Sequence, residues 1–232
     1  MAIFKNGDDL RQDILTLQMI EIMDRIWLDN DLDLAMTPYK VLTTDCEQGF
    51  MEFNANAATL AEIQYEYSLI NTFSDTTIMN WFKKHIKNDI EKNKETAGLR
   101  DKEKHYLFKE KLQKIRDVFI RSTAGYCVAS YVLGLGDRHP DNIMINYKEG
   151  NLIHIDFGHF LENKKTITQL GSTVKKLGIL RERDPFVFTG EIAYFVNGRA
   201  FKKNQNTKDD DVVLVSASTR QNTPETSRNV TE

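Results

Sequence analysis

The chain has 232 residues, of which 41% are hydrophobic and 28% charged, so it is long and apolar enough to form a substantial core. Its formal net charge of −3 gives no overall attraction for nucleic acid, and none is expected as a partner. The first residues lack the apolar core of a signal peptide, and no run approaches the roughly 20 apolar residues that span a bilayer, which favours a cytoplasmic protein with peripheral membrane contact.

The first long element in chain order is a helix predicted from about Asp9 to Trp27, with Asp8 or Asp9 as its cap. Lys5 precedes this helix at the expected end of a strand, and Asp13 lies in its first turn, so the two side chains are expected to converge. Two interleaved apolar rows at helical spacing predict burial over a wide face: Leu10, Ile14, Leu17 and Leu15, Met19, Ile22, Ile26.

Two short strands are predicted next, at Val41–Thr43 and Gly49–Phe53, separated by a polar turn. They would complete a small lobe that also contains the strand of Lys5.

Cys46 and Cys127 lie far apart without metal-site spacing, so we expect two buried thiols in a reducing compartment.

The charge-rich stretch 83–116 is predicted to be a solvated helical insertion. A helical stripe then runs from Leu112 to Val132 and should anchor the loop that follows it. A hairpin is predicted from strands at 143–146 and 152–155 around a turn at 148–150. The polar tail from Asn204 lacks apolar periodicity and is expected to be disordered.

The segment 135–144, Leu-Gly-Asp-Arg-His-Pro-Asp-Asn-Ile-Met, carries the chemically informative residues, together with Asp156-Phe157-Gly158. Transfer of a phosphoryl group from ATP requires a positioned acceptor hydroxyl and metal ions held over the phosphates. Asp137 or His139 could meet the hydroxyl, whereas Asn142 and Asp156 offer the hard oxygen ligands that Mg²⁺ prefers. The five-residue interval from Asp137 to Asn142 is that of a kinase catalytic loop.

The order Asp-Arg-His at 137–139 resembles the phosphoinositide-kinase superfamily rather than ordinary protein kinases. Three further segments resemble phosphoinositide 3-kinase catalytic subunits of class I or class II, and the similarity runs from about Ile3 to Gly198. These segments are Phe-Lys-Asn-Gly-Asp-Asp-Leu-Arg-Gln-Asp at 4–13, Ala-Gly-Tyr-Cys-Val-Ala at 124–129 and His-Ile-Asp-Phe-Gly-His-Phe-Leu at 154–161.

The resemblance implies an α+β, two-lobed kinase catalytic core over residues 1–203, with a small-lobe part at 1–53, a hinge at about 53–56 and a large-lobe part at 57–203. Residues 204–232 would be the disordered tail. Family members have further strands before the position of Lys5 and further helices after the end of the similarity. We therefore expect an incomplete small lobe and a truncated large lobe.

The implied activity is transfer of the ATP γ-phosphate to the 3-hydroxyl of a phosphatidylinositol headgroup in phosphoinositide signalling. A phosphatidylinositol 4-kinase, a related protein kinase, and a catalytically impaired fragment or pseudokinase remain as alternatives. Implied partners are a phosphoinositide lipid at a membrane surface and, within a longer chain, a regulatory subunit. The implied cofactors are ATP and Mg²⁺, with Mn²⁺ as a second choice.

The resemblance also assigns roles to residues. Asp137 and His139 would be catalytic, although Asp137 could act as the base or orient His139, and His139 could merely hydrogen-bond the backbone. Asn142 and Asp156 would hold metal, while Arg138 would organise the loop. The expected nucleotide-site residues are Lys5, Asp13, Tyr39, Glu52, Asn54, Met144 and Ile155, of which Asp13 and Tyr39 could instead serve as helix cap and core.

A cationic segment follows Asp-Phe-Gly at the position of an activation loop. Its six cations suit the phosphates of a lipid headgroup, although a solvated basic loop is the alternative. They are Lys164, Lys165, Lys175, Lys176, Arg181 and Arg183. His154 and His159 flank Asp-Phe-Gly and are expected to pack or hydrogen-bond, since none of the histidines at 85, 105, 154 and 159 has zinc-site spacing.

Overall fold

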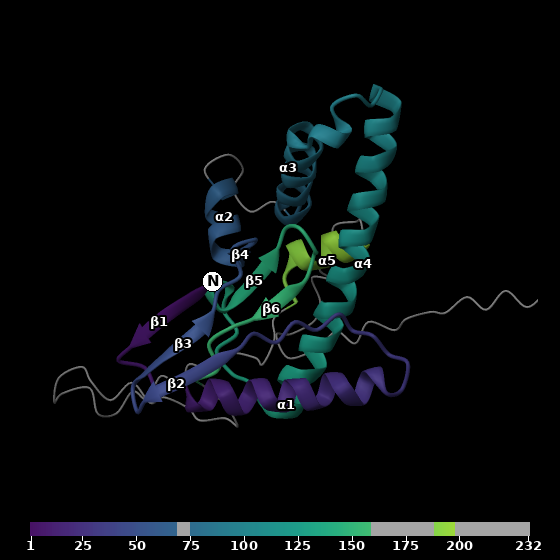
Figure 1. The fold of residues 1–232 in the computed structure, drawn as a ribbon. Helices are drawn as coiled ribbons and strands as arrows, with labels where there is room; N and C mark the ends of the chain where they lie inside the picture. Colours follow the sequence, from purple (N-terminus) through teal and green to yellow (C-terminus); the bar gives the residue numbers. More distant parts are fainter. Residues whose placement is uncertain (69–74, 159–187, 198–232) are drawn as a thin grey trace, which may run out of the picture. The chain divides into compact units, whose positions relative to one another are not determined.

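In the part of the chain that the structure describes, two small antiparallel sheets, each of three strands, combine with helices in a mixed α+β fold (Figure 1). The computed structural model describes residues 1–68, 75–158 and 188–197. The first sheet has the strand order β1 (Ala2–Asn6), β3 (Gln48–Glu52), β2 (Val41–Asp45). The predicted strands at 41–43 and 49–53 are confirmed with small shifts at their ends, and Cys46 and Glu47 form the turn between them.

The helix α1 (Arg11–Leu28) follows β1, as predicted. Its N-cap is Leu10, without a side-chain cap hydrogen bond, so the predicted cap at Asp8 or Asp9 was wrong, although Asp9 accepts the backbone N–H of Arg11 at 3.1 Å. Only one of its two apolar rows is buried: Leu10 and Leu17 are nearly inaccessible. The prediction of a widely buried helix was wrong, because the second row faces solvent in the described structure: Leu15, Met19, Ile22 and Ile26. A helix that packs on one side only buries a single stripe.

The second sheet has the order β4 (Ala57–Thr59), β5 (Ile143–Asn146), β6 (Leu152–His154). The hairpin of β5 and β6 is confirmed, with Ile143 opposite His154, and the turn contains Gly150 at φ +95°. This positive φ favours glycine, as does the backbone oxygen of Ile115, which lies 2.4 Å from where a Cβ would be. The chain passes from β3 to β4 through residues 53–56, the predicted hinge.

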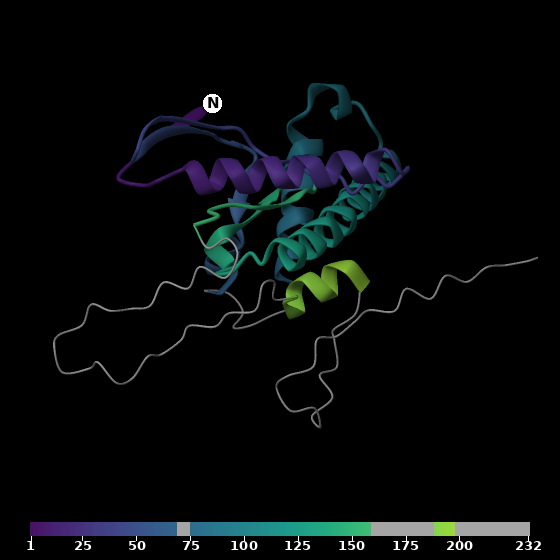
Figure 2. The same ribbon diagram turned by 90° about the horizontal axis from the view of Figure 1, so that it is seen from below.

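Two helices, α2 (Leu60–Ser68) and the long α4 (Asp101–Leu133), pack on the second sheet. The helices α3 (Thr77–Lys92) and α5 (Gly190–Asn197) pack against α4 and each other, and a short 3-10 helix lies at Lys94–Thr96. Figure 2 shows α5 alongside α4. The stretch 83–116 is helical as predicted, but it is not merely a solvated insertion, because Ile86, Ile90 and Ile115 are buried in the core.

Three aromatic rings join α3, α4 and α5. Phe195 stacks on Phe82 and meets Phe119 edge-on, with ring centroids 4.9 Å apart in both pairs. All three side chains are fully buried. Aromatic pairs of this geometry add to the stabilisation that burial itself provides, so this cluster anchors α5 to the long helix.

The helix α4 also fixes the hairpin that leads to Asp156. The Ser122 hydroxyl accepts the backbone N–H of Leu152 at 2.9 Å, and the ring of His154 stacks on Tyr126, with centroids 4.6 Å apart. The prediction that His154 packs is therefore confirmed. The predicted stripe of α4 is only partly buried, since Val128 and Val132 are exposed.

Cys46 and Cys127 are free thiols, as expected, but both are exposed, so their predicted burial was wrong. Across the described ranges, no helix is both long and apolar enough to cross a membrane. The predicted tail at 204–232 and His159 lie outside the described residues.

Candidate active site

The segment after α4 is a tightly hydrogen-bonded loop. α4 ends at Leu133, and the next residue, Gly134, caps it with a left-handed backbone (φ 57°), a common way for a helix to end. Asp137 also has a positive φ, of 56°, and its carbonyl accepts both the backbone N–H of His139 and the side-chain amide of Asn142, each at 3.0 Å. A short 3-10 turn at Pro140–Asn142 then leads into β5. These bonds bring Asp137, His139 and Asn142 together.

The imidazole of His139 lies between two carboxylates. Its Nε2 is 3.7 Å from Asp137 Oδ2, and its Nδ1 is 3.5 Å from Asp141 Oδ2. Both the His139 and the Asp137 side chains are partly exposed, so both are accessible from solvent. The sequence reasoning selected His139 and Asp137 but missed Asp141, whose position two residues after His139 was the available signal.

Asp156 follows the hairpin and lies beside the loop at 135–142. The backbone N–H of Ile155 donates to the carbonyl of Asn142 at 3.0 Å, which joins the two segments. Asp156 has φ +58°, a left-handed conformation that is uncommon outside glycine and least costly for Asn and Asp. Its side chain is exposed, and its Oδ1 accepts the backbone N–H of Gly158 at 3.4 Å.

The donor set at this place fits a divalent cation bound with a nucleotide. The amide nitrogen of Asn142 is committed to the Asp137 carbonyl, which leaves the amide oxygen as the atom that can meet a metal ion. Together with the exposed carboxylate of Asp156, it gives two hard oxygen ligands, as suits Mg²⁺ among phosphates. Within residues 1–68, 75–158 and 188–197, no group of three or more His, Cys, Asp or Glu side chains is arranged so that it could hold a metal ion by itself.

Arg138 is buried and organises the loop, as the sequence suggested. Its guanidinium donates to the backbone carbonyls of Gly136 at 2.9 Å and Ile155 at 2.7 Å, and also to that of Asp156. Its Cζ lies 5.3 Å from the centroid of the Phe157 ring. Burial lowers the pKa of Arg138, and the charges of Asp156 and Asp137 partly offset that effect.

Lys5 and Asp13 come from β1 and α1, but the expected contact between them is not the one formed. Lys5 donates a hydrogen bond to Asp8 at 2.9 Å, a partner the prediction missed although it lies three residues away. Burial lowers the pKa of Lys5, but Asp8, Asp156 and Asp13 outweigh it, so the pKa is raised. Lys5 thus shares an electrostatic environment with Asp156 and Asp13.

Asp13 is only 4% exposed and accepts the backbone N–H of Phe157 at 3.2 Å. Burial raises its pKa, and the charge of Asp156 adds to that rise, whereas the Phe157 hydrogen bond and Lys5 act against it. Tyr39 stacks on Phe157, with centroids 6.4 Å apart, and burial raises the pKa of its hydroxyl. Both residues therefore contact the Asp-Phe-Gly segment.

The four remaining nucleotide-site candidates lie at or beside the hinge and the hairpin. Glu52 accepts the backbone N–H of Lys40, and Asn54 accepts that of Asn56, each at 3.1 Å. Met144 lies in β5 opposite Thr59, and Ile155 follows β6; both side chains are partly buried. The six cations of the predicted lipid-binding loop, between Lys164 and Arg183, lie outside the described residues.

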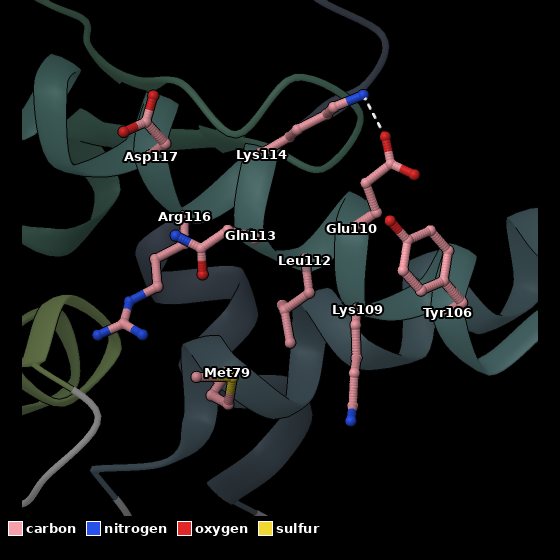
Figure 3. A pocket seen from close by; sticks show the side chains of 9 residues that line it. All are labelled: Met79, Tyr106, Lys109, Glu110, Leu112, Gln113, Lys114, Arg116 and Asp117. Atoms are coloured by element: carbon pink, nitrogen blue, oxygen red, sulfur yellow. Dashed lines mark ion pairs between the residues drawn. The ribbon is translucent and has the colours of Figure 1, made fainter.

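A groove of about 810 Å³ lies elsewhere, along α3 and the first half of α4 (Figure 3). Within it, Lys114 pairs with Glu110 at 2.7 Å. None of the predicted site residues lines this groove: its walls are Met79, Tyr106, Lys109, Glu110, Leu112, Gln113, Lys114, Arg116 and Asp117. The candidate active site is therefore defined by the loop contacts and not by this groove.

Comparison with known proteins agrees with the resemblance seen in the sequence motifs. A family model described as "Phosphatidylinositol 3- and 4-kinase" matches residues 1–223. The chain belongs to this family. The resemblance drawn from the motifs at 4–13, 124–129, 135–144 and 154–161 is thereby confirmed.

Curated relatives of this kinase domain come from distant organisms. The chain is 44% identical over 207 residues to phosphatidylinositol 3-kinase 1 of Dictyostelium discoideum, covering 88% of this chain and 11% of that protein. It is 42% identical over 197 residues to the rat phosphatidylinositol 3-kinase C2 domain-containing subunit gamma, and this match covers 84% of this chain and 11% of that protein. It is 41% identical over 197 residues to the human phosphatidylinositol 4-phosphate 3-kinase C2 domain-containing subunit beta, and this match covers 85% of this chain and 10% of that protein. The chain thus spans about a tenth of the length of these relatives.

Proposed function

We propose that this kinase domain transfers the γ-phosphate of ATP to the 3-hydroxyl of a phosphatidylinositol headgroup. The observation that carries the proposal is the hydrogen-bonded convergence of Asp137, His139 and Asn142 with the segment of Asp156. The 3-position is supported by the relatives, whose names describe 3-kinases. The family model covers 3- and 4-kinases, so 4-phosphorylation is the second candidate.

The residues have distinct roles in this proposal. Asp137 and His139 orient the acceptor hydroxyl and handle its proton. Asn142 and Asp156 would hold Mg²⁺, or Mn²⁺ as a second choice, and the bound cation would supply charge neutralisation at the phosphates. Lys5 would meet a phosphate of ATP, because its ammonium group is cationic at neutral pH and shares the electrostatic environment of Asp156 and Asp13. Asp13, Tyr39, Glu52, Asn54, Met144 and Ile155 would form or support the nucleotide site.

The proposal includes a two-lobed organisation over residues 1–203. The first sheet and α1 would form the small-lobe part, whereas the second sheet and the helices α2 to α5 would form the large-lobe part. Residues 53–56 would join the two parts. This division is supported by the two separate sheets that the hinge segment connects. The cationic loop at 164–183 would bind the headgroup phosphates at a membrane surface, where the cytoplasmic protein would be recruited peripherally. A regulatory subunit is a further proposed partner.

The test is incorporation of radiolabel from [γ-³²P]ATP into phosphatidylinositol vesicles, followed by chromatography of the deacylated product to identify the phosphorylated hydroxyl. We expect the 3-phosphate, and its loss in His139→Ala. Product at the 4-hydroxyl would replace the proposal by the second candidate. A folded protein that binds Mg·ATP but makes no product would support the impaired-fragment alternative.

The role of the cationic loop has its own experiment. Lys164→Ala/Lys165→Ala and Lys175→Ala/Lys176→Ala should weaken binding to phosphoinositide vesicles at low salt, because each removes charge that attracts the headgroup. The matched control is Lys92→Ala/Lys94→Ala, which removes the same charge from the α3 end. Parental vesicle binding by both loop variants would reject the loop as the recognition element.

A further inference from the structure

The peptide unit between Asp156 and Phe157 is held from both sides by buried, charged side chains. Its carbonyl, on Asp156, accepts a hydrogen bond from the Arg138 guanidinium. Its N–H, on Phe157, donates to the Asp13 carboxylate at 3.2 Å. Asp13 and Arg138 are 4% and 3% exposed, respectively, so water competes little for these bonds.

The two side chains come from distant parts of the sequence. Asp13 lies in the first turn of α1, and Arg138 lies in the catalytic loop that follows α4. Arg138 also holds the carbonyls of Gly136 and Ile155, which ties the catalytic loop and the hairpin end to the same guanidinium. Phe157 completes the contact, because its ring lies under Arg138 and beside Tyr39.

This peptide needs such support. Asp156 has φ +58°, and a non-glycine residue in the left-handed region persists only where its surroundings hold it there. The conformation decides where the Asp156 carboxylate points. Whatever fixes the peptide therefore fixes the proposed metal ligand.

We propose that Asp13 and Arg138 are positioning residues that clamp the Asp156–Phe157 peptide and so set the direction of the Asp156 carboxylate. The proposal deepens the proposed function and, for its catalytic consequence, rests on it. It gives Asp13 a role other than pairing with Lys5 or lining the nucleotide pocket. It also makes the position of α1 a determinant of the metal ligand, since Asp13 moves with that helix.

The direct test is amide hydrogen exchange at Phe157 in the full chain, measured by NMR without nucleotide. Asp13→Ala removes the acceptor and should speed this exchange roughly tenfold or more, since hydrogen bonds to charged groups are among the stronger ones. Asp13→Asn keeps an acceptor oxygen and should stay within about threefold of the parent. Arg138→Lys keeps the charge but cannot span the three carbonyls, so it should speed exchange as well.

Asp24→Ala is the matched control, because it removes a carboxylate from the same helix away from the clamp. Its Phe157 exchange should equal that of the parent. Unchanged Phe157 exchange in a folded Asp13→Ala protein would overturn the proposal. If the Asp13→Ala protein does not fold, the Arg138→Lys protein provides the test. Phe157 amide exchange at the parental rate in Arg138→Lys would then overturn the proposed clamp.

The kinetic consequence separates positioning from nucleotide binding. With phosphatidylinositol as substrate, Asp13→Ala should lower kcat more than it raises KM for ATP, and Asp13→Asn should recover most of the loss. A rise in KM alone, with unchanged exchange, would identify Asp13 as a pocket residue and refute the clamp. Absence of lipid phosphorylation by the parent would count against the proposed function, whereas the exchange result would still test the clamp.

Discussion

The Nδ1 atom of His139 accepts a hydrogen bond from the backbone N–H of Asp141 at 3.2 Å. In a neutral imidazole, one nitrogen accepts and the other carries the proton. The bond therefore places the proton on Nε2, the nitrogen 3.7 Å from Asp137 Oδ2. His139 also acts as the N-cap of the turn at Pro140–Asn142, so it has a structural role beside its proposed catalytic one.

The two roles of His139 can be separated by substitution. His139→Asn supplies another side-chain acceptor, and Asn is among the preferred N-cap residues, so the melting temperature should stay close to that of the parent. Lipid phosphorylation should fall at least about a hundredfold, the usual scale for losing a group that acts on a transferred proton. His139→Ala should lose both cap and activity. Near-parental turnover by a folded His139→Asn protein would show that the imidazole serves only the turn.

The aromatic contact of α5 predicts a large stability effect. Phe119→Ala should lower the free energy of unfolding by about 3–5 kcal/mol, because it leaves a cavity beside Phe82 and Phe195. Ile120→Ala is the control: the neighbouring side chain is 37% exposed and should cost much less. Urea denaturation of the two variants and the parent measures both losses of unfolding free energy. Equal losses would mean that the aromatic cluster does not anchor α5.

The packing of His85 leads to a prediction of how the free energy of unfolding depends on pH. Its ring lies against Trp81 and Tyr147, with centroids 4.7 and 4.3 Å away, and burial followed by the charge of Lys84 lowers its pKa. Below pH 6.5, the unfolded chain takes up a proton that the folded chain resists, so this residue makes stability fall as the pH drops through that range. Well above pH 6.5, His85 is neutral in the folded and the unfolded chain, and its contribution to the pH dependence of stability vanishes.

His85→Phe keeps an aromatic ring and removes the titration. Denaturation at pH 5.5 and 7.5 should therefore show a smaller loss at the lower pH for His85→Phe than for the parent. His105→Phe, at a position on the exposed face of α4, is the control and should behave as the parent. The explanation fails if His85→Phe and the parent lose the same stability between the two pH values.

The extent of what sequence could predict follows from the kind of interaction involved. The hairpin and the second half of α4 were predictable, because a Gly-containing turn and periodic apolar residues are local signals. Which row of α1 is buried was not predictable, since Leu17 and Met19 are equally apolar and only packing against other elements distinguishes them. The loop at 135–142 was selected from its motif, and its catalytic role stays a prediction. The hydrogen bond from Phe157 to Asp13 was missed, because it joins residues 144 positions apart and leaves no local pattern.

The last prediction concerns Asp156 as a ligand of the nucleotide-bound metal. Asp156→Asn should keep the turn, because Asn tolerates a positive φ as Asp does, while removing the carboxylate charge. Calorimetry with ATP should then show that Mg²⁺ no longer strengthens binding, a loss of roughly tenfold or more in affinity for Mg·ATP. Affinity for ATP without the metal should change little. Asp89→Asn, which removes a carboxylate at the far end of α3, should leave both affinities unchanged. Equal Mg·ATP affinity in Asp156→Asn and the parent would reject the ligand assignment.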